Sequence, residues 1–285
     1  MIDCYRLQAA LLLLLLPVIA FGQSGWTKKK GEWYAQTDAS FFASDRYYSV
    51  AGMENRGNTF SSYALKVYAE YGWTDRLTTI VNWPFLKLQQ FSGTEIVAGM
   101  GDAQVGLKYA LSQKLPIAIG LSVDIPTDDG LLFSQHKEPN ELGIIEQINL
   151  PTSDGEWNFR PLLAISKSFN GGRSYACLYA ALNLRTKNYS HQWQSGLELG
   201  QFLFDRLWLI GRLNQQHRFS ADNSPGVTFL YGEGTTYSAV NLSLLYQLNS
   251  HWRLTAGYQN YVDFLVPLRN MYNGATYSIG LAVEY

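Results

Sequence analysis

Charged side chains recur at alternate positions of several segments whose intervening residues are apolar. Near position 105, Asp102 and Lys108 fall in one phase, while Leu107 and Tyr109 fall in the other. Side chains on a β-strand alternate between its two faces, so such charges collect on one face. Facing an enclosed interior, they could line a solute path and set its selectivity, or pair into a salt-bridged plug. The candidates are Lys66, Glu70, Asp102, Lys108, Asp124, Arg160, Arg185, Glu198, Arg212 and Arg253, with Glu284 on the last segment.

One pair of residues could support hydrolysis. If the turn at 204–206 centres on Asp205, Ser195 lies opposite Gln215 on the next strand. His217 is then the diagonal neighbour of Ser195, on the same face of the sheet. A serine within reach of a histidine could act as a nucleophile with its base. No third, orienting group and no oxyanion donor accompany them, so two unconnected polar residues are the favoured interpretation and a lipase is the less favoured one.

Residue types that serve other chemistries are sparse or scattered. The four histidines, at 136, 191, 217 and 251, are dispersed, which does not favour metal ligation. The glycine-rich run 99–106 has the pattern of a strand opening without the helix that a phosphate-binding loop requires. The formal net charge of −1 disfavours a nucleic-acid partner. We therefore expect no enzyme activity, no metal, no cofactor and no nucleic acid.

The elements that would position the charged residues are strands of alternating character. In the last segment, Tyr277, Ile279, Leu281, Val283 and Tyr285 share one face, opposite small or polar residues. Twelve such segments can be counted, and most are about 11 to 13 residues long, which suits tilted membrane-spanning strands. They cover residues 32–44, 59–71, 77–89, 100–111, 116–126, 156–168, 174–186, 192–203, 207–219, 236–248, 252–263 and 275–285.

The connections between these segments alternate in length, with one exception at 187–191. Short periplasmic turns alternating with longer external loops are typical of outer-membrane barrels, and an even strand number places both chain ends on the periplasmic side. The longest connection, 127–155, is acidic and could fold inward as a constriction or remain outside as a solvated cap. Two interfacial girdles are expected, one from Trp73, Trp208 and Trp252 beside short turns, and the other from Trp83, Trp157 and Trp193.

The first 22 residues have the pattern of a secretory signal peptide. Arg6 precedes an apolar run, 9–21, that is too short to span a bilayer as a helix. We therefore expect a cleaved signal at 1–22 and one barrel domain over 23–285. Cys4 would leave with the signal, so Cys177 would be the single cysteine of the mature chain and could form no internal disulfide.

A secreted soluble sandwich or a ligand-carrying barrel would also show alternation. The length of the segments and the alternating lengths of their connections favour the membrane. A soluble lipid carrier would also require an apolar interior, whereas the face opposite the apolar one carries charged and small residues here.

Three short stretches resemble an outer-membrane family named after the meta-pathway of phenol degradation, whose members are described as transporters. They are Gly99-Met100-Gly101-Asp102-Ala103-Gln104-Val105-Gly106-Leu107-Lys108-Tyr109, Gly72-Trp73-Thr74-Asp75-Arg76-Leu77, and Gly120-Leu121-Ser122-Val123-Asp124-Ile125-Pro126-Thr127. The resemblance implies an outer-membrane barrel that passes small compounds, including hydrophobic or aromatic ones. The chain departs from the family pattern after Thr127, where Asp128-Asp129-Gly130 follows.

Together these features predict an all-β, antiparallel, up-and-down barrel of about twelve strands in a bacterial outer membrane, acting as a passive channel for small solutes. A non-conducting structural or surface-interaction barrel is the alternative. Membrane lipids, a small solute and the barrel assembly machinery are the expected partners. The assembly machinery is expected because an aromatic C-terminus in phase with an apolar strand face resembles the assembly signal of such barrels. The signal would comprise Tyr277, Ile279, Leu281, Val283 and Tyr285.

Overall fold

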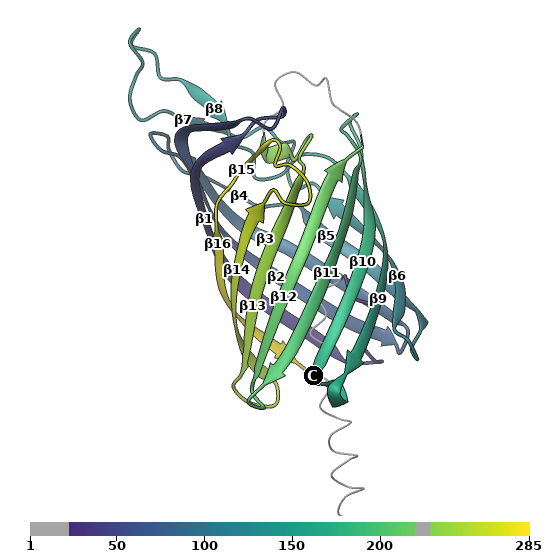
Figure 1. Ribbon diagram of the computed structural model, residues 1–285. Helices are drawn as coiled ribbons and strands as arrows, with labels where there is room; N and C mark the ends of the chain where they lie inside the picture. The colour runs from purple at the N-terminus through teal and green to yellow at the C-terminus, as the bar shows by residue number, and fades with distance from the viewer. Residues whose placement is uncertain (1–22, 220–228) are drawn as a thin grey trace, which may run out of the picture.

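The strands of the protein close into an antiparallel barrel (Figure 1). The structure is a computed structural model that describes residues 23–219 and 229–285. The expected signal peptide, 1–22, lies outside the described residues. The twelve barrel strands are β1 (Trp33–Tyr48), β2 (Glu54–Thr74), β3 (Leu77–Phe91), β5 (Ala103–Ser112), β6 (Ile117–Ile125), β9 (Asn158–Phe169), β10 (Ser174–Arg185), β11 (Gln192–Leu203), β12 (Leu207–Arg218), β13 (Tyr237–Gln247), β14 (Trp252–Val262) and β16 (Thr276–Glu284).

The predicted twelve-strand barrel is confirmed, and each expected segment corresponds to one strand. The alternating sequence pattern missed only short elements. β4 (Val97–Gly99) pairs with β3, β15 (Met271–Tyr272) pairs with β1, and β7 (Phe133–Gln135) and β8 (Gln147–Asn149) form a separate hairpin. Two short 3-10 turns, η1 (Asn170–Gly172) and η2 (Phe229–Tyr231), complete the described elements, and none of the helical segments among them could cross a membrane.

The barrel closes between its first and last strands. Within β1, Tyr34 is opposite Glu284 of β16 on one side and opposite Glu70 of β2 on the other. Closure pairs the edges that an open sheet would expose, so the backbone polar groups of the wall are satisfied in a bilayer. We call the end with the short turns, at 75–76, 113–116, 170–173, 204–206 and 248–251, the periplasmic end, and the opposite end the loop end.

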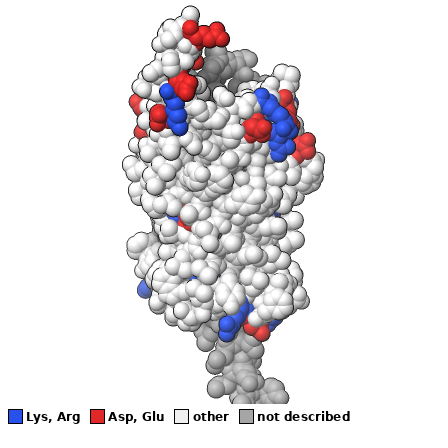
Figure 2. All heavy atoms as spheres, turned by 90° about the vertical axis from the view of Figure 1, so that its left-hand side faces the viewer, with Lys and Arg blue, Asp and Glu red and all other residues white. Residues whose placement is uncertain are grey.

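The outer face of the barrel is apolar. Leu107, Leu121 and Leu163 are about half exposed on neighbouring strands, and Ile279 is 66% exposed. On the face shown in Figure 2, Lys, Arg, Asp and Glu gather toward the two ends, and the broad band between them is almost free of charge. Such a surface would be unfavourable in water over this area, and it matches the hydrocarbon core of a membrane.

Residues 23–32 form the N-terminal segment, which crosses the periplasmic end and enters the lumen with its buried part. Ser24 and Lys28 are buried, and the backbone N–H of Gly25 donates to Oγ of Ser166 at 2.8 Å. Trp26 packs edge-on against Tyr175, with the ring centroids 5.5 Å apart. The segment before the first strand therefore narrows the lumen.

This segment explains why β12 alternates poorly. Trp208 is 5% exposed and Ile210 is fully buried, and both point inward to form a cluster with Tyr175 and Leu245, against which Trp26 packs. The prediction that Trp208 belongs to the periplasmic girdle is therefore wrong. An apolar residue on the inner face is stable here because a segment distant in sequence covers it, which no strand periodicity reveals.

Aromatic side chains and inward-folded loops cover the loop end. Phe60, Phe91 and Leu150 form a buried cluster, against which Phe229 and Tyr272 pack. Leu150 belongs to the longest connection, so the inner part of that loop enters the barrel. Its β7–β8 hairpin projects outward beside the barrel mouth (Figure 1). The inner part of the loop thus narrows the lumen, as the first of the two alternatives left open by the sequence requires, and the hairpin stays outside the barrel.

Candidate functional site

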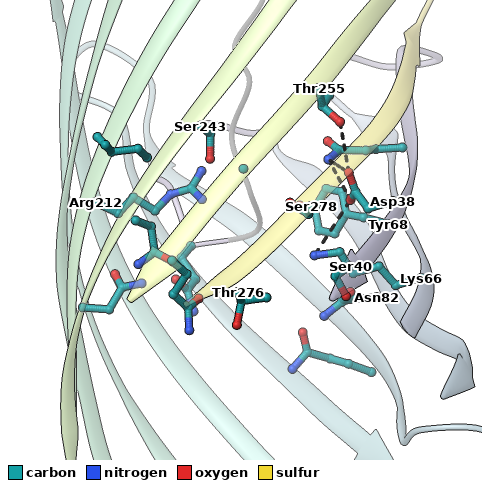
Figure 3. Close-up of a pocket in the computed structure, with 18 of the residues that line it drawn as sticks. Asp38, Ser40, Lys66, Tyr68, Asn82, Arg212, Ser243, Thr255, Thr276 and Ser278 are labelled. Carbon is teal, nitrogen blue, oxygen red and sulfur yellow. Dashed lines mark hydrogen bonds and ion pairs between the residues drawn. The ribbon is translucent and has the colours of Figure 1, made fainter. Parts of the chain in front are cut away.

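The middle of the barrel encloses a cavity of about 400 Å³. This size lies within the range of about 300–1,000 Å³ that small-molecule sites occupy. The inward positions of successive strands supply its polar lining, and Figure 3 shows these side chains converging from opposite walls. The lining includes the amides of Gln36, Asn82, Gln104, Gln194, Asn214, Asn241 and Gln259, and the hydroxyls of Ser40, Ser122, Ser243, Thr255, Thr276 and Ser278.

Two of the cations lining this cavity, Arg160 and Arg212, form close ion pairs. Arg160 Nη2 lies 2.5 Å from Oδ2 of Asp124. Arg212 donates from Nε to Glu198, which also accepts a 2.6 Å hydrogen bond from the Tyr175 hydroxyl. Each guanidinium is therefore held by a carboxylate on an adjacent strand, which offsets the cost of removing both charges from water.

Lys66 and Asp38 form the third, looser pair, at 3.8 Å. Asp38 is buried and accepts hydrogen bonds from Gln36 at 2.8 Å and from Thr255 at 3.0 Å (Figure 3). The side chain of Lys66 is 39% exposed. The Lys66 ammonium is therefore the most accessible of the three cations.

A second cavity of about 330 Å³ lies next to the first, toward the loop end. The two share Asn82, Gln104 and Arg160 in their walls. Asp124 also lines the second cavity and accepts from Nε2 of Gln104 at 2.8 Å. Arg160 and Gln104 therefore mark the boundary between the two polar compartments.

Arg185 holds two loops together at the top of the second cavity. Its guanidinium contacts Glu156, with Nε donating at 2.6 Å, and lies 3.4 Å from Asp154 and 3.5 Å from Glu233. It also donates to the backbone carbonyl of Tyr231 at 2.5 Å. Asp154 and Glu156 belong to the long loop, and Tyr231 and Glu233 to the connection before β13. One buried cation thus fixes both loops over the mouth.

The carboxyl groups around Arg185 outnumber its single positive charge. Burial raises the pKa of Glu156 to about 7, an effect that the nearby Arg185 opposes and that Asp154 and Glu233 reinforce. The protonation state of Glu156 therefore changes near neutral pH.

Asp102 anchors the same long loop to the wall. Its carboxylate accepts from the Ser153 hydroxyl, and from the backbone N–H of Asp154 at 3.2 Å. Burial and the charge of Asp154 raise the pKa of Asp102 to about 6. A Cβ on Gly99 would lie 2.2 Å from Oγ1 of Thr152, so this glycine leaves space for the loop to pass. The stretch that resembles the transporter family is therefore where the loop docks.

The remaining predicted charges lie below the central cavity. Glu70 is buried and accepts from the Tyr68 hydroxyl, and Lys108 is fully buried, with no hydrogen-bond acceptor for its Nζ among the described residues. Arg253 lies 2.8 Å from Glu284, which also pairs with Lys28 of the N-terminal segment. The ion pair between Lys28 and Glu284 holds that segment in place, and none of these charged groups lines a cavity wall.

Three carboxylates of the lumen lie outside the set of ten charged residues that the sequence pattern predicts. They are Asp38, Glu156 and Glu233. Asp38 alternates in phase with Gln36 and Ser40, so strand periodicity could have identified it. Glu156 and Glu233 lie in connections, where no period exists to show which way a side chain points.

The ten predicted residues divide into three groups by their position within the lumen. Lys66, Arg160 and Arg212 line the central cavity; Asp102, Asp124, Arg160 and Arg185 line the upper one; Glu70, Lys108, Glu198 and Arg253 are buried among other inner side chains.

Ser195 and His217 lie on adjacent strands in the register that the sequence suggested, with Ser195 opposite Gln215. Gln215 donates to the Ser195 hydroxyl at 2.8 Å. In the described part of the chain, His217 makes no hydrogen bond to Ser195. The structure therefore gives this pair no nucleophile and base geometry.

The C-terminal residue lies in an aromatic stack at the barrel seam. The ring of Tyr285 stacks on His251 at 4.1 Å and on Trp33 at 5.2 Å between centroids. Its backbone exchanges two hydrogen bonds with Trp33, at 2.8 and 3.0 Å. Tyr277, Ile279 and Leu281 of the proposed assembly signal are exposed on the outer face, and Val283 is half-buried.

Comparison with known proteins relates the chain to barrels by structure alone. No family model and no curated protein match its sequence. A solved outer-membrane channel from Pseudomonas putida F1, of the group COG4313, is similar over 94% of this chain and all of its own, with a TM-score of 0.67 and 11% identity. The translocator domain of the autotransporter NalP from Neisseria meningitidis is similar over 99% of this chain and 95% of its own, with a TM-score of 0.53 and 10% identity.

At these identities the similarity shows the fold, which is that of an outer-membrane β-barrel. The closed wall and the apolar outer face agree with this fold and with lipid around the barrel. The protein is therefore an integral barrel of a bacterial-type outer membrane.

Proposed function

We propose that the protein is a passive channel for small solutes. The observation that carries this proposal is the pair of adjacent polar cavities within a closed barrel whose outer face is apolar. Polar groups directed into a lumen are costly unless water or a solute reaches them. A barrel that only anchored a surface partner would have no need to keep this volume unfilled.

The covers at both ends restrict what could pass. Residues 23–32 narrow the periplasmic end, and the inner part of the long loop narrows the loop end. These covers favour small solutes and low conductance, and they are the features that also support the alternative, a non-conducting barrel.

Conductance across a planar bilayer tests the proposal. We expect purified, folded protein to produce small, discrete current steps and to admit small solutes into liposomes. A folded preparation that passes neither ions nor solutes would exclude the channel and favour the non-conducting barrel.

Two tryptophan substitutions on one strand make this test specific to the lumen. Ser243 lines the central cavity, whereas the neighbouring Leu244 is 43% exposed on the outer face. Ser243→Trp should fill the cavity and reduce the conductance about twofold or more, because side chains lining a narrow pore control its passage. Leu244→Trp should leave the current unchanged. Equal currents from both variants would place the conducting path elsewhere.

Hydrophobic or aromatic compounds are one candidate class for the solute, as the resemblance to the phenol-pathway family implies, and their contact with the protein would be at the loop end and not in the polar central cavity. The feature that favours them is the cluster of Phe60, Phe91, Phe229 and Tyr272 at the loop end, whose rings could contact an apolar compound. Saturation-transfer NMR with phenol tests this contact. A signal that disappears in Phe229→Ser would support an aromatic entry site, and the absence of any signal from the unmodified protein would contradict it.

A further inference from the structure

Every charged side chain that lines the central cavity belongs to an ion pair. Arg160, Arg212 and Lys66 each face a carboxylate, and Asp124, Glu198 and Asp38 are those partners. Within this set, no unit of charge is left over. A cavity that concentrates anions or cations needs an excess of the opposite sign, because an ion pair presents little net field to a third charge.

The groups that remain for a solute are neutral hydrogen-bonding groups. Carboxamides and hydroxyls dominate the rest of the wall, and each can both donate and accept. Nδ2 of Asn241 and Nε of Arg160 are buried and meet no acceptor in the part of the chain that the structure describes. The wall therefore offers both donors and acceptors without a preferred sign of charge.

We propose that the central cavity is a binding compartment for a small, uncharged, polyhydroxylated solute of monosaccharide size. The proposal rests on the channel function above and names its solute class. Hydroxyl groups of such a solute donate and accept in turn, so they can satisfy amides and hydroxyls on all sides. A cavity of about 400 Å³ holds one molecule of this size.

The same chemistry disfavours the two other solute classes. A charged solute would compete with ion pairs already formed and would lose its own hydration without a free counter-charge. An aromatic hydrocarbon would cover amides and hydroxyls without bonding to them, and each polar group left unsatisfied costs about 1–3 kcal/mol.

Liposome swelling with three sugars of similar size tests the proposal: neutral galactose, anionic galacturonate and cationic galactosamine. The protein should admit galactose about threefold faster than either charged sugar, because the balanced lumen favours neither charge. A charged sugar that enters as fast as galactose overturns the proposal.

Neutralising the partner carboxylate of one cation at a time tests the charge balance itself. Glu198→Gln leaves Arg212 without its carboxylate, and Asp124→Asn does the same for Arg160. In each variant the rate for galacturonate, relative to galactose, should rise about tenfold, because an unbalanced charge acts at short range in a narrow lumen. Asp205→Asn is the control, since Asp205 is exposed in a periplasmic turn. If neither lumen variant changes the ratio, the proposal fails.

Binding separates this proposal from the channel function. Saturation-transfer NMR of the purified full-length barrel should show contact with galactose, and Ser243→Trp should abolish it. Galactose contact without ionic conductance would reject the channel and retain the compartment. Conductance without galactose contact or galactose entry would retain the channel and reject the compartment.

Discussion

Glu156 is the side chain whose chemistry depends most on its neighbours at the barrel mouth. Its ordinary pKa of 4.5 is raised to about 7 by burial. A carboxyl group with a raised pKa in the folded state stabilises that state when protonated, and the stabilisation is lost as the pH rises through about 7. The two loops that Arg185 holds together should therefore close the mouth more tightly in acid than in alkali, because protonation relieves the repulsion among Glu156, Asp154 and Glu233.

The direction of the pKa shift of Glu156 predicts how the conductance depends on pH. Single-channel conductance should rise between about pH 5 and about pH 8 as these two loops loosen, with the main step near 7. Recording in about 1 M salt screens the charges at the mouth, so the current reports the width of the opening. Glu156→Gln should lose the step near 7 and keep a smaller one near 6, where Asp102 titrates.

Glu141→Gln provides the control for this prediction. Glu141 is exposed in the loop between β7 and β8, away from Arg185. Its removal should not change the pH profile. A Glu156→Gln profile identical to that of the unmodified protein would contradict the role of this carboxyl group.

Among the elements, the N-terminal segment is the one that narrows the lumen at the periplasmic end. Its backbone follows the inner wall, where Lys28 N–H donates to the Thr78 hydroxyl at 2.8 Å and Gly31 N–H donates to the Gly72 carbonyl at 2.8 Å. A Cβ on Gly72 would lie 2.0 Å from the backbone oxygen of Lys29, so the wall has no side chain where the segment crosses it.

Removal of this segment should open the periplasmic end. Deletion of residues 24–31 is expected to raise the conductance about twofold or more, because the narrowest part of a pore limits its current. The paired substitution Lys29→Ala and Lys30→Ala is the control, since both side chains are exposed. Unchanged current after the deletion would mean that the constriction lies at the loop end.

At the scale of the whole molecule, the seam between β1 and β16 decides whether a barrel exists. Tyr285 contributes two backbone hydrogen bonds and a ring stacked between His251 and Trp33. Until this seam forms, both strands are unpaired edges in lipid, which is costly for every unsatisfied N–H and C=O group. We propose that the exposed apolar residues of β16, with Tyr285, are also what the assembly machinery recognises.

Deletion of Tyr285 should reduce the fraction of protein that inserts, measured as the heat-modifiable form on electrophoresis after refolding into vesicles and after expression in cells. Tyr246→Ala is the matched control, since Tyr246 is an exposed aromatic residue on β13 away from the seam. A defect in cells alone would indicate recognition by the assembly machinery. A defect in both would indicate closure of the seam, and normal insertion in both would contradict both roles.

The sequence by itself determined the wall of this protein. Alternation with a period of two is a local property, so it identified the twelve strands and the phase that places Leu107 outside and Lys108 inside. It also found most of the charged residues of the lumen, because a charge on the inner phase of a strand has no other direction in which to point.

Only the tertiary structure decided what fills the lumen. The burial of Trp208 depends on Trp26, and the pairing of Arg185 with Glu156 and Glu233 depends on two loops meeting above it. Connections have no period, and the partners are far apart in the chain. Their contacts follow from barrel closure, which first brings the loops and the N-terminal segment to the same lumen, so that burial and charge can select their positions.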